Sequence, residues 1–203
     1  TGAFDLSVGS IIAITSVTIA TLAPDLGVVL AAVVAVLAAL FIGFLNGVVV
    51  GLTRIHPAII TLGAAALLRG IAFAMTRMGD IGPMRIEDID GINPGILNWV
   101  TLFLTLILAA GLVYTLSRSG YRWSSSETEG QGLASRLWPV GLFTLSGLVA
   151  GLAGVSITGR VGVGTAEVGS GFEVIAIGVA LLGGVAVGRG ASSQTGLAIV
   201  GTL

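Results

Sequence analysis

The stretch LNGVVVGLTRIHPAIITLGAAALLRG, from Leu45 to Gly70, places a short polar turn between two apolar runs. The runs on either side extend over residues 26–53 and 57–76, and a helix needs about 20 apolar residues to cross the hydrocarbon core of a membrane. Pro57 opens the second run, and proline suits the first turn of a helix because its missing N–H would have no partner there. The stretch therefore predicts two membrane-spanning helices joined by a tight turn.

The composition of the whole chain favours a membrane environment. Of its 203 residues, 55% are hydrophobic and 9% are charged, whereas soluble domains carry about 25% charged residues. The mean hydropathy is +1.06. The apolar residues form continuous blocks, unlike the alternating strands of a membrane β-barrel. We therefore predict an all-α, polytopic integral membrane protein.

Apolar blocks of similar length recur along the chain. Besides the two runs above, we expect spans over residues 6–23, 97–117, 138–158 and 171–188, with a seventh beginning near residue 193. The run 26–53 is long for one span, so it either tilts or ends near Asn46. Because the chain opens on Thr1 and stops inside an apolar run, we expect a single transmembrane domain over 1–203 with spans missing at both ends.

Three stretches between the predicted spans are polar or rich in glycine. Residues 77–96 are acidic, residues 118–137 form an equally long stretch without an apolar span, and residues 159–170 form a glycine-rich loop. If 118–137 is cytoplasmic, the positive-inside rule is weakly satisfied, and the glycine-rich loop lies on the outer side. The arginines then divide into Arg54, Arg118, Arg122, Arg136 and Arg189 inside, and Arg77, Arg85 and Arg160 outside.

The charged and reactive residues exclude several functions. The net charge is −1, which gives no basic surface for nucleic acid, and cysteine is absent, which removes thiolate chemistry. All nine basic residues are arginine, so the chain has no P-loop lysine and any ATP chemistry belongs to another subunit. The single histidine, His56, is best explained as a turn residue. We therefore expect no enzyme activity, no cofactor and no metal site.

Asp5, Ser7 and Asn46 are polar residues in or beside apolar runs. Asp5 has the position of a helix N-cap, where a carboxylate accepts hydrogen bonds from free backbone N–H groups. Alternatively, Asp5 and Ser7 border a translocation path, if this helix begins within the membrane. Asn46 is most simply explained by a hydrogen bond between helices.

Arg69 and Glu173 are charged residues near the ends of predicted spans. The long side chain of Arg69 could reach the outer membrane interface, line a polar path, or pair with an acid of residues 77–96. Glu173 could interact with the positive N-terminal end of its helix, act as a gate, or contact a docked binding protein. The sequence leaves these alternatives open.

Four motifs follow one another in the chain: Phe4–Ser10 (FDLSVGS), Asn46–Gly70 (NGVVVGLTRIHPAIITLGAAALLRG), Leu145–Val155 (LSGLVAGLAGV) and Gly169–Gly190 (GSGFEVIAIGVALLGGVAVGRG). Their content and order resemble the permease subunits of bacterial ABC importers for ribose and other simple sugars. Within the second motif, the Asn-Gly pair, the proline, the Ile-x-Thr-Leu-Gly run and the Arg-Gly pair match the signature of that family. The likeness extends over nearly the whole chain.

The resemblance implies a core of roughly ten spans, of which about seven fit in this chain. It also implies that a second permease subunit, identical or different, completes a pore in the inner membrane, surrounded by lipid. Separate ATP-binding subunits would drive transport, and a periplasmic binding protein would deliver the solute. On this interpretation the translocation-path candidates are Asp5, Ser7, Asn46, Arg69 and Glu173.

The resemblance makes residues 118–137 the cytoplasmic segment that docks on the ATPase, whereas their serine-rich composition alone is equally typical of a solvated loop. The Ala-Ala-Arg core that the family carries there is absent from this chain. The ATPase-coupling candidates are Arg118, Arg122, Glu127, Glu129 and Arg136. Arg160 and Glu167 are candidate contacts for the binding protein, or else solvated residues of the outer loop.

Other functions stay open at this point. A related importer could carry branched amino acids or a signalling furanose instead of a simple sugar. An ATP-independent channel or secondary transporter is a different class, and such carriers often show internal repeats and buried acid–base relays. An intramembrane hydrolase would need more than the turn-placed His56.

Overall fold

The computed structural model describes residues 4–53, 55–77, 79–82, 133–175 and 178, together with short runs within 99–114. The described part contains four long helices, which are α1 (Val8–Leu26), α2 (Val28–Leu52), α3 (Pro57–Thr76) and α5 (Leu133–Val161). Each is long and apolar enough to cross a membrane. The described residues of 99–114 are helical as well. The prediction of an all-α, polytopic membrane protein is confirmed.

The helices agree with the predicted spans wherever the two can be compared. α1 covers most of the predicted span 6–23, α3 coincides with 57–76, and α5 contains 138–158. α2 continues past Asn46 to Leu52, so the long apolar run is one uninterrupted helix. The spans predicted over 97–117 and 171–188 and near 193 lie wholly or partly outside the described residues, as do residues 118–132 of the predicted coupling segment.

Two tight turns join the first three helices. Gly27 separates α1 from α2 and has a φ of 78°, a backbone conformation that glycine adopts without a steric penalty. At the second turn His56 is the N-cap of α3, and its Nδ1 accepts from the Ala58 N–H at 3.3 Å. Pro57 occupies the first turn of α3, as predicted. His56 is exposed, which confirms its interpretation as a turn residue.

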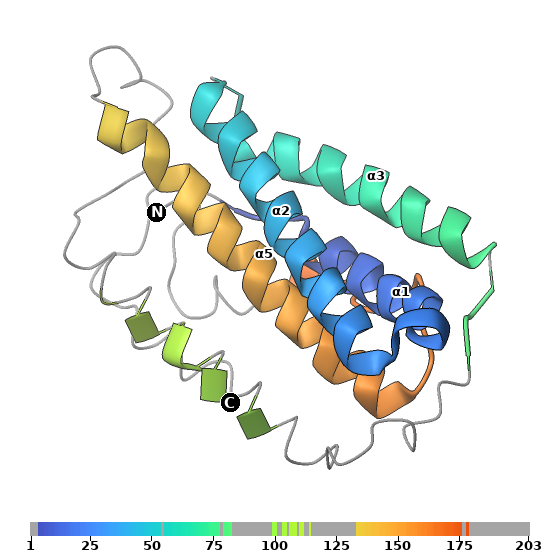
Figure 1. Ribbon diagram of the computed structural model, residues 1–203. Coiled ribbons are helices and arrows are strands. Elements are labelled where there is room, and N and C mark those ends of the chain that lie inside the picture. The colour runs from blue at the N-terminus through green and yellow to red at the C-terminus, as the bar shows by residue number, and fades with distance from the viewer. Residues whose placement is uncertain are drawn as a thin grey trace.

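α1 is the central helix of the described bundle. It contacts α2, α3 and α5, and α2 also lies along α5 (Figure 1). The core of the bundle is built mainly on α1, where Ile11, Ile12 and Val17 are fully buried. The opposite faces of α2 and α3 expose large apolar side chains such as Leu37 and Leu67. These faces suit contact with lipid or with further membrane helices, because water would disfavour so large an apolar surface.

Glycine brings α2 and α5 into backbone contact. A methyl group placed on Gly43 of α2 would lie 3.0 Å from the Cα of Gly147 on α5 and would overlap the Phe143 carbonyl oxygen. Gly47 approaches the backbone of Val140 in the same way. Helices in a membrane associate through such close packing, since lipid offers no hydrophobic driving force between them. The glycines therefore decide how closely the two longest described helices meet.

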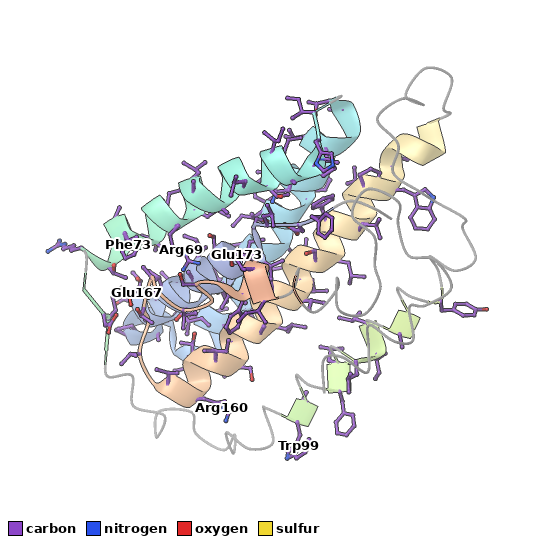
Figure 2. All side chains as sticks on the ribbon, turned by 180° about the vertical axis from the view of Figure 1, so that it is seen from behind. Arg69, Phe73, Trp99, Arg160, Glu167 and Glu173 are labelled. Carbon is purple, nitrogen blue, oxygen red and sulfur yellow. The ribbon has the colours of Figure 1, made fainter. Side chains whose placement is uncertain are left out.

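The chain that follows α5 turns back along α1, and we call residues 162–171 the re-entrant segment (Figure 2). A methyl group on Gly164 would meet Ala20 and the Ser16 carbonyl, and one on Gly169 would meet Gly9. The residues from Ala20 back to Gly9 span about 16 Å of helix. The sequence predicted an outer loop here; the segment is non-helical, but it descends beside a membrane-spanning helix instead of staying at its end.

Candidate functional site

A polar network surrounds the start of α1. One carboxylate oxygen of Asp5, Oδ1, accepts from the Ser7 backbone N–H at 2.9 Å and from the Ser7 hydroxyl at 2.6 Å. The other oxygen, Oδ2, accepts from the Ser146 hydroxyl of α5 at 2.6 Å. Asp5 was predicted to be the N-cap of the helix, and this is wrong, because the helix begins at Val8 with Ser7 as its N-cap. The carboxylate instead closes a turn on the residue two positions later, as aspartate commonly does.

The network extends to α2 and α3. The Asn46 side-chain amide donates to the Ser7 hydroxyl at 2.9 Å, and Asn46 is buried. The Leu6 backbone N–H donates to the Thr61 hydroxyl at 3.0 Å, and this hydroxyl in turn donates to the Pro57 carbonyl at 3.1 Å. The prediction that Asn46 bonds across to another element is confirmed. The start of α1 is thus tied to each of the other three long helices.

This network lies inside the bundle and not at its rim. Asn46 precedes the end of α2 at Leu52 by about 9 Å of helix. α1 consequently begins deeper in the bundle than the turn that joins α2 to α3. The non-helical residues 4–7 lead into it. Non-helical backbone at membrane depth persists only where protein or a water-filled cavity satisfies its polar groups. Here Asp5 and Thr61 supply the partners.

A second polar site joins α3 to the re-entrant segment. The Nη1 atom of Arg69 donates to the Ala166 carbonyl at 2.5 Å and to the Val168 carbonyl at 2.9 Å. These carbonyls belong to non-helical backbone and therefore lack the partners that a helix would provide. The sequence suggested a membrane interface, a polar path or a loop acid for Arg69. The observed hydrogen-bond acceptors of Arg69 are backbone carbonyls close to 100 positions away in the chain, and its place on a translocation path stays a prediction.

Further backbone bonds hold the re-entrant segment in place. Ile81, just after α3, exchanges two hydrogen bonds with Gly164, each 2.8 Å long. Within the segment, Ser170 donates to the Glu167 carbonyl at 3.0 Å, and the Glu167 N–H donates to the Thr165 hydroxyl at 3.2 Å. The segment is therefore attached to α3 through Arg69, to the chain after α3 through Ile81, and to α1 through glycine contacts.

Glu173 lies directly after this segment, in a short helical turn over residues 172–175. Its Oε2 atom is buried and has no hydrogen-bond partner. The same oxygen packs against Gly9 in the first turn of α1, where any larger residue would overlap it. The carboxylate is also close enough to Arg69 for the two charges to attract one another, and Figure 2 shows both side chains. A buried acceptor without a partner is unfavourable, and the nearby guanidinium offsets part of that cost.

The remaining candidates are not gathered at these two sites. Arg160 lies at the C-terminal end of α5 and is exposed, and Glu167 is an exposed residue of the re-entrant segment. Arg118, Arg122, Glu127 and Glu129 lie outside the described residues, and for Arg136 only the helical backbone is described. Among the described residues, no group of three or more His, Cys, Asp or Glu side chains could hold a metal ion.

Sequence reasoning missed two partners. Ser146 sits inside the predicted apolar span 138–158, where nothing in the sequence indicated a polar partner, so its bond to Asp5 was not foreseen. The carbonyls that Arg69 binds carry no side-chain signal at all. The only hint was the density of glycine at 162, 164, 169 and 171, which is typical of backbone that approaches other backbone closely.

Comparison with known proteins gives one consistent group. The family described as "Branched-chain amino acid transport system / permease component" matches residues 1–203. The chain is 32% identical over 213 residues to the D-allose transport system permease protein AlsC of Escherichia coli K12, covering 98% of this chain and 65% of that protein. It is 30% identical over 208 residues to the autoinducer 2 import system permease protein LsrC of Yersinia pseudotuberculosis YPIII, covering 97% of this chain and 58% of that protein.

The chain thus spans less than two thirds of the length of these curated relatives. No solved structure matches it.

Proposed function

Because the chain belongs to the family of branched-chain amino acid transport system permease components, we propose that it forms part of the membrane pore of a binding-protein-dependent ABC importer for a simple sugar. It is a multi-pass protein of the inner membrane. The family consists of transport permeases and not of enzymes. The observation that carries the proposal is the match over the whole chain, together with a relative named for D-allose transport.

The proposed assembly contains several subunits. A second permease, identical or different, completes the pore, and a periplasmic binding protein delivers the solute. The chain has no lysine with which to build a P-loop, so ATP hydrolysis takes place on separate cytoplasmic subunits. Closure of those subunits on ATP changes the access of the pore from one side of the membrane to the other.

The translocation path is proposed to run beside the two buried polar sites. Asp5, Ser7 and Asn46 form the first, and Arg69 with Glu173 forms the second. Polar and charged side chains are costly within a membrane, and those that occur commonly face the bundle interior or a water-filled pathway. A sugar carries many hydroxyl groups, which need hydrogen-bonding partners along any route through an apolar bundle.

Coupling to ATP hydrolysis is proposed for residues 118–137. An ATPase can move a permease only through a cytoplasmic segment that seats against it, and this stretch ends in the first turn of α5. Since α5 carries Ser146, a displacement of the N-terminal end of α5 would be transmitted through Ser146 to the polar network around Asp5. The proposed contacts are Arg118, Arg122, Glu127, Glu129 and Arg136. On the opposite side, Arg160 and Glu167 are proposed contacts for the binding protein.

Co-purification tests the assembly. The full-length gene product is tagged, expressed in membranes with the candidate ATPase, and captured. The expected result is recovery of the ATPase, and loss of that recovery when 120–137 is replaced by a Gly/Ser linker. A matched control replaces the acidic residues 85–92 in the same way and keeps the ATPase. Failure of the intact protein to recover the ATPase would overturn the ABC assignment in favour of an ATP-independent carrier.

Uptake into proteoliposomes tests the cargo. Binding protein, full-length permease and ATPase are reconstituted, and ATP-dependent uptake of D-allose, ribose and leucine is compared. We expect uptake of a sugar and none of leucine. Ribose is included because of the motif resemblance, and D-allose because of the relative that carries its name. Uptake of leucine alone would contradict the proposed sugar cargo.

A second cargo is favoured by a specific observation. The permease of the Yersinia autoinducer 2 importer is 30% identical to this chain over nearly its full length. Autoinducer 2 is therefore the first competitor to add to the uptake assay. Competition by autoinducer 2 at concentrations at which the sugars do not compete would assign the importer to that signalling molecule.

A further inference from the structure

The re-entrant segment is held at membrane depth by a charged donor that has a second acceptor close by. Arg69 donates to two neutral carbonyls, those of Ala166 and Val168. The buried Oε2 atom of Glu173 receives no hydrogen bond and lies beside Gly9 together with the Gly169 carbonyl, one residue after the Val168 carbonyl that Arg69 binds. Hydrogen bonds between two charged groups are stronger than those to a neutral carbonyl. The present arrangement therefore leaves the stronger acceptor unused.

We propose that Arg69 is a positioning residue that holds the re-entrant segment against α1, and that Glu173 is the alternative acceptor to which its guanidinium moves when the segment is released during transport. This inference rests on the proposed function, since release of the segment is a step of a transport cycle. Arg69 touches no solute in this role. It acts through the backbone of residues 162–171.

Two arrangements of one guanidinium give the segment two states. With Arg69 on the carbonyls, the segment is bound and the Glu173 oxygen is unsatisfied. With Arg69 on Glu173, the carboxylate is satisfied and the segment loses both bonds to α3. Each arrangement satisfies one set of acceptors at the expense of the other, so neither is favoured overwhelmingly. Such near balance is what a switching element requires.

The packing of the segment suits this movement. Gly164 and Gly169 approach α1 through backbone atoms, and between them only the small side chain of Ala166 is buried in the α1 core, with Val168 packed against it. Gly162 and Gly171, at the two ends of the segment, have φ values of 72° and 83°, which glycine alone adopts freely. The segment also borders Gly9, two residues after Ser7, so its release would uncover the first turn of α1 beside the polar network.

Hydrogen exchange and transport together test the proposal. The full-length permease, assembled with its ATPase in lipid nanodiscs, is compared as wild type, Arg69→Gln and Glu173→Gln. Arg77→Gln is the matched control, because Arg77 is an exposed arginine at the C-terminal end of α3. Deuterium uptake is followed in peptides covering 162–171, and solute uptake is followed in proteoliposomes.

The two variants are expected to differ in their effect on amide exchange in the segment and to have the same effect on transport. Arg69→Gln raises amide exchange in 162–171 at least about tenfold, because two charge-assisted hydrogen bonds are lost or replaced by a weaker neutral one. Glu173→Gln leaves exchange there unchanged or lower, because the guanidinium keeps its carbonyl partners. Both variants slow transport, the first because the segment is not held and the second because it is not released. Arg77→Gln changes neither measurement.

Several outcomes would overturn the proposal. Unchanged exchange in Arg69→Gln removes the holding role, and increased exchange in Glu173→Gln shows that the carboxylate is merely structural. Exchange in the peptides of α1 serves as a folding check. If Arg69→Gln also raises amide exchange in α1, the variant Arg69→Lys decides whether Arg69 holds the segment. Lysine keeps a charged donor and is expected to restore part of the protection of 162–171 from exchange. If the wild type transports none of the solutes tested, the proposed function fails, while the exchange measurements still decide the role of Arg69.

Discussion

The hydroxyl of Ser146 donates to the carboxylate of Asp5 at 2.6 Å, although 141 positions separate the two residues in the chain. The bond joins the non-helical approach to α1 with the middle of α5. Because the proposed coupling segment 118–137 includes the first residues of α5, this bond also connects that segment with the buried polar network. Asp5 thus links the start of α1 to α5, and we expect its removal to lower both the stability of the protein and its rate of transport.

Asp5→Ala is expected to lower the free energy of unfolding by about 2 kcal/mol, because the Ser7 N–H and the Ser7 and Ser146 hydroxyls lose their shared acceptor. Thermal denaturation of the purified full-length permease in detergent measures the change. Asp25→Ala is the matched control, since Asp25 is exposed near the end of α1. Equal stability of the two variants would show that the Asp5 bonds contribute nothing.

Thr61→Val is expected to destabilise the protein by about 1 kcal/mol while keeping the shape of the side chain. Valine cannot accept from the Leu6 N–H, which would be left without its partner at the start of α1. Thr61→Ser keeps the hydroxyl and is expected to lose less. The comparison uses the denaturation midpoints of the two variants, and a serine variant as unstable as the valine one would contradict the role of the hydroxyl.

Gly43→Ala is expected to destabilise the bundle by about 1–3 kcal/mol, because the added methyl group meets the α5 backbone. Gly63→Ala provides a control with the same chemical change, because nothing lies within 4 Å of a methyl group at that exposed position of α3. There alanine should be neutral or slightly stabilising, owing to its higher helix propensity. Thermal denaturation distinguishes the two, and similar midpoints would refute the close α2–α5 contact.

Gly164→Ala is expected to displace the re-entrant segment, because its new methyl group would overlap the Ala20 side chain. Adding Ala20→Gly to the same protein should restore part of the lost stability, although glycine itself costs about 1 kcal/mol in a helix. The result is measured as a double-mutant cycle on the free energy of unfolding. Additive effects of the two changes would mean that the segment does not pack on α1 at this point.

Much of the fold followed from local pattern. The apolar runs on both sides of His56 and Pro57 predicted two helices and the turn between them, and these are α2 and α3. Helix formation in a membrane depends on a run of apolar residues of sufficient length, which can be read directly from the chain. Asn46 was correctly expected to bond to another element, because a buried amide in an apolar environment requires a partner.

The partners themselves could not be read in this way. Arg69 was assigned to an interface, a path or a loop acid, and it binds backbone carbonyls that carry no residue-specific signal. The glycine-rich stretch after α5 was placed in an outer loop, because loops between spans are expected at the membrane surface. Its course along α1 depends on glycine contacts with Gly9, Ser16 and Ala20, which exist only once the helices are packed.

The sequence by itself determined that this protein is a bundle of membrane helices of the permease type, since composition, span length and ordered motifs are all local properties. Only the tertiary structure decided which buried polar groups meet. Ser146 donates to Asp5, and Arg69 donates to the re-entrant segment, because a donor at membrane depth must use whichever acceptor the packed helices bring within reach. That choice is made by three-dimensional proximity, which the order of residues in the chain does not specify.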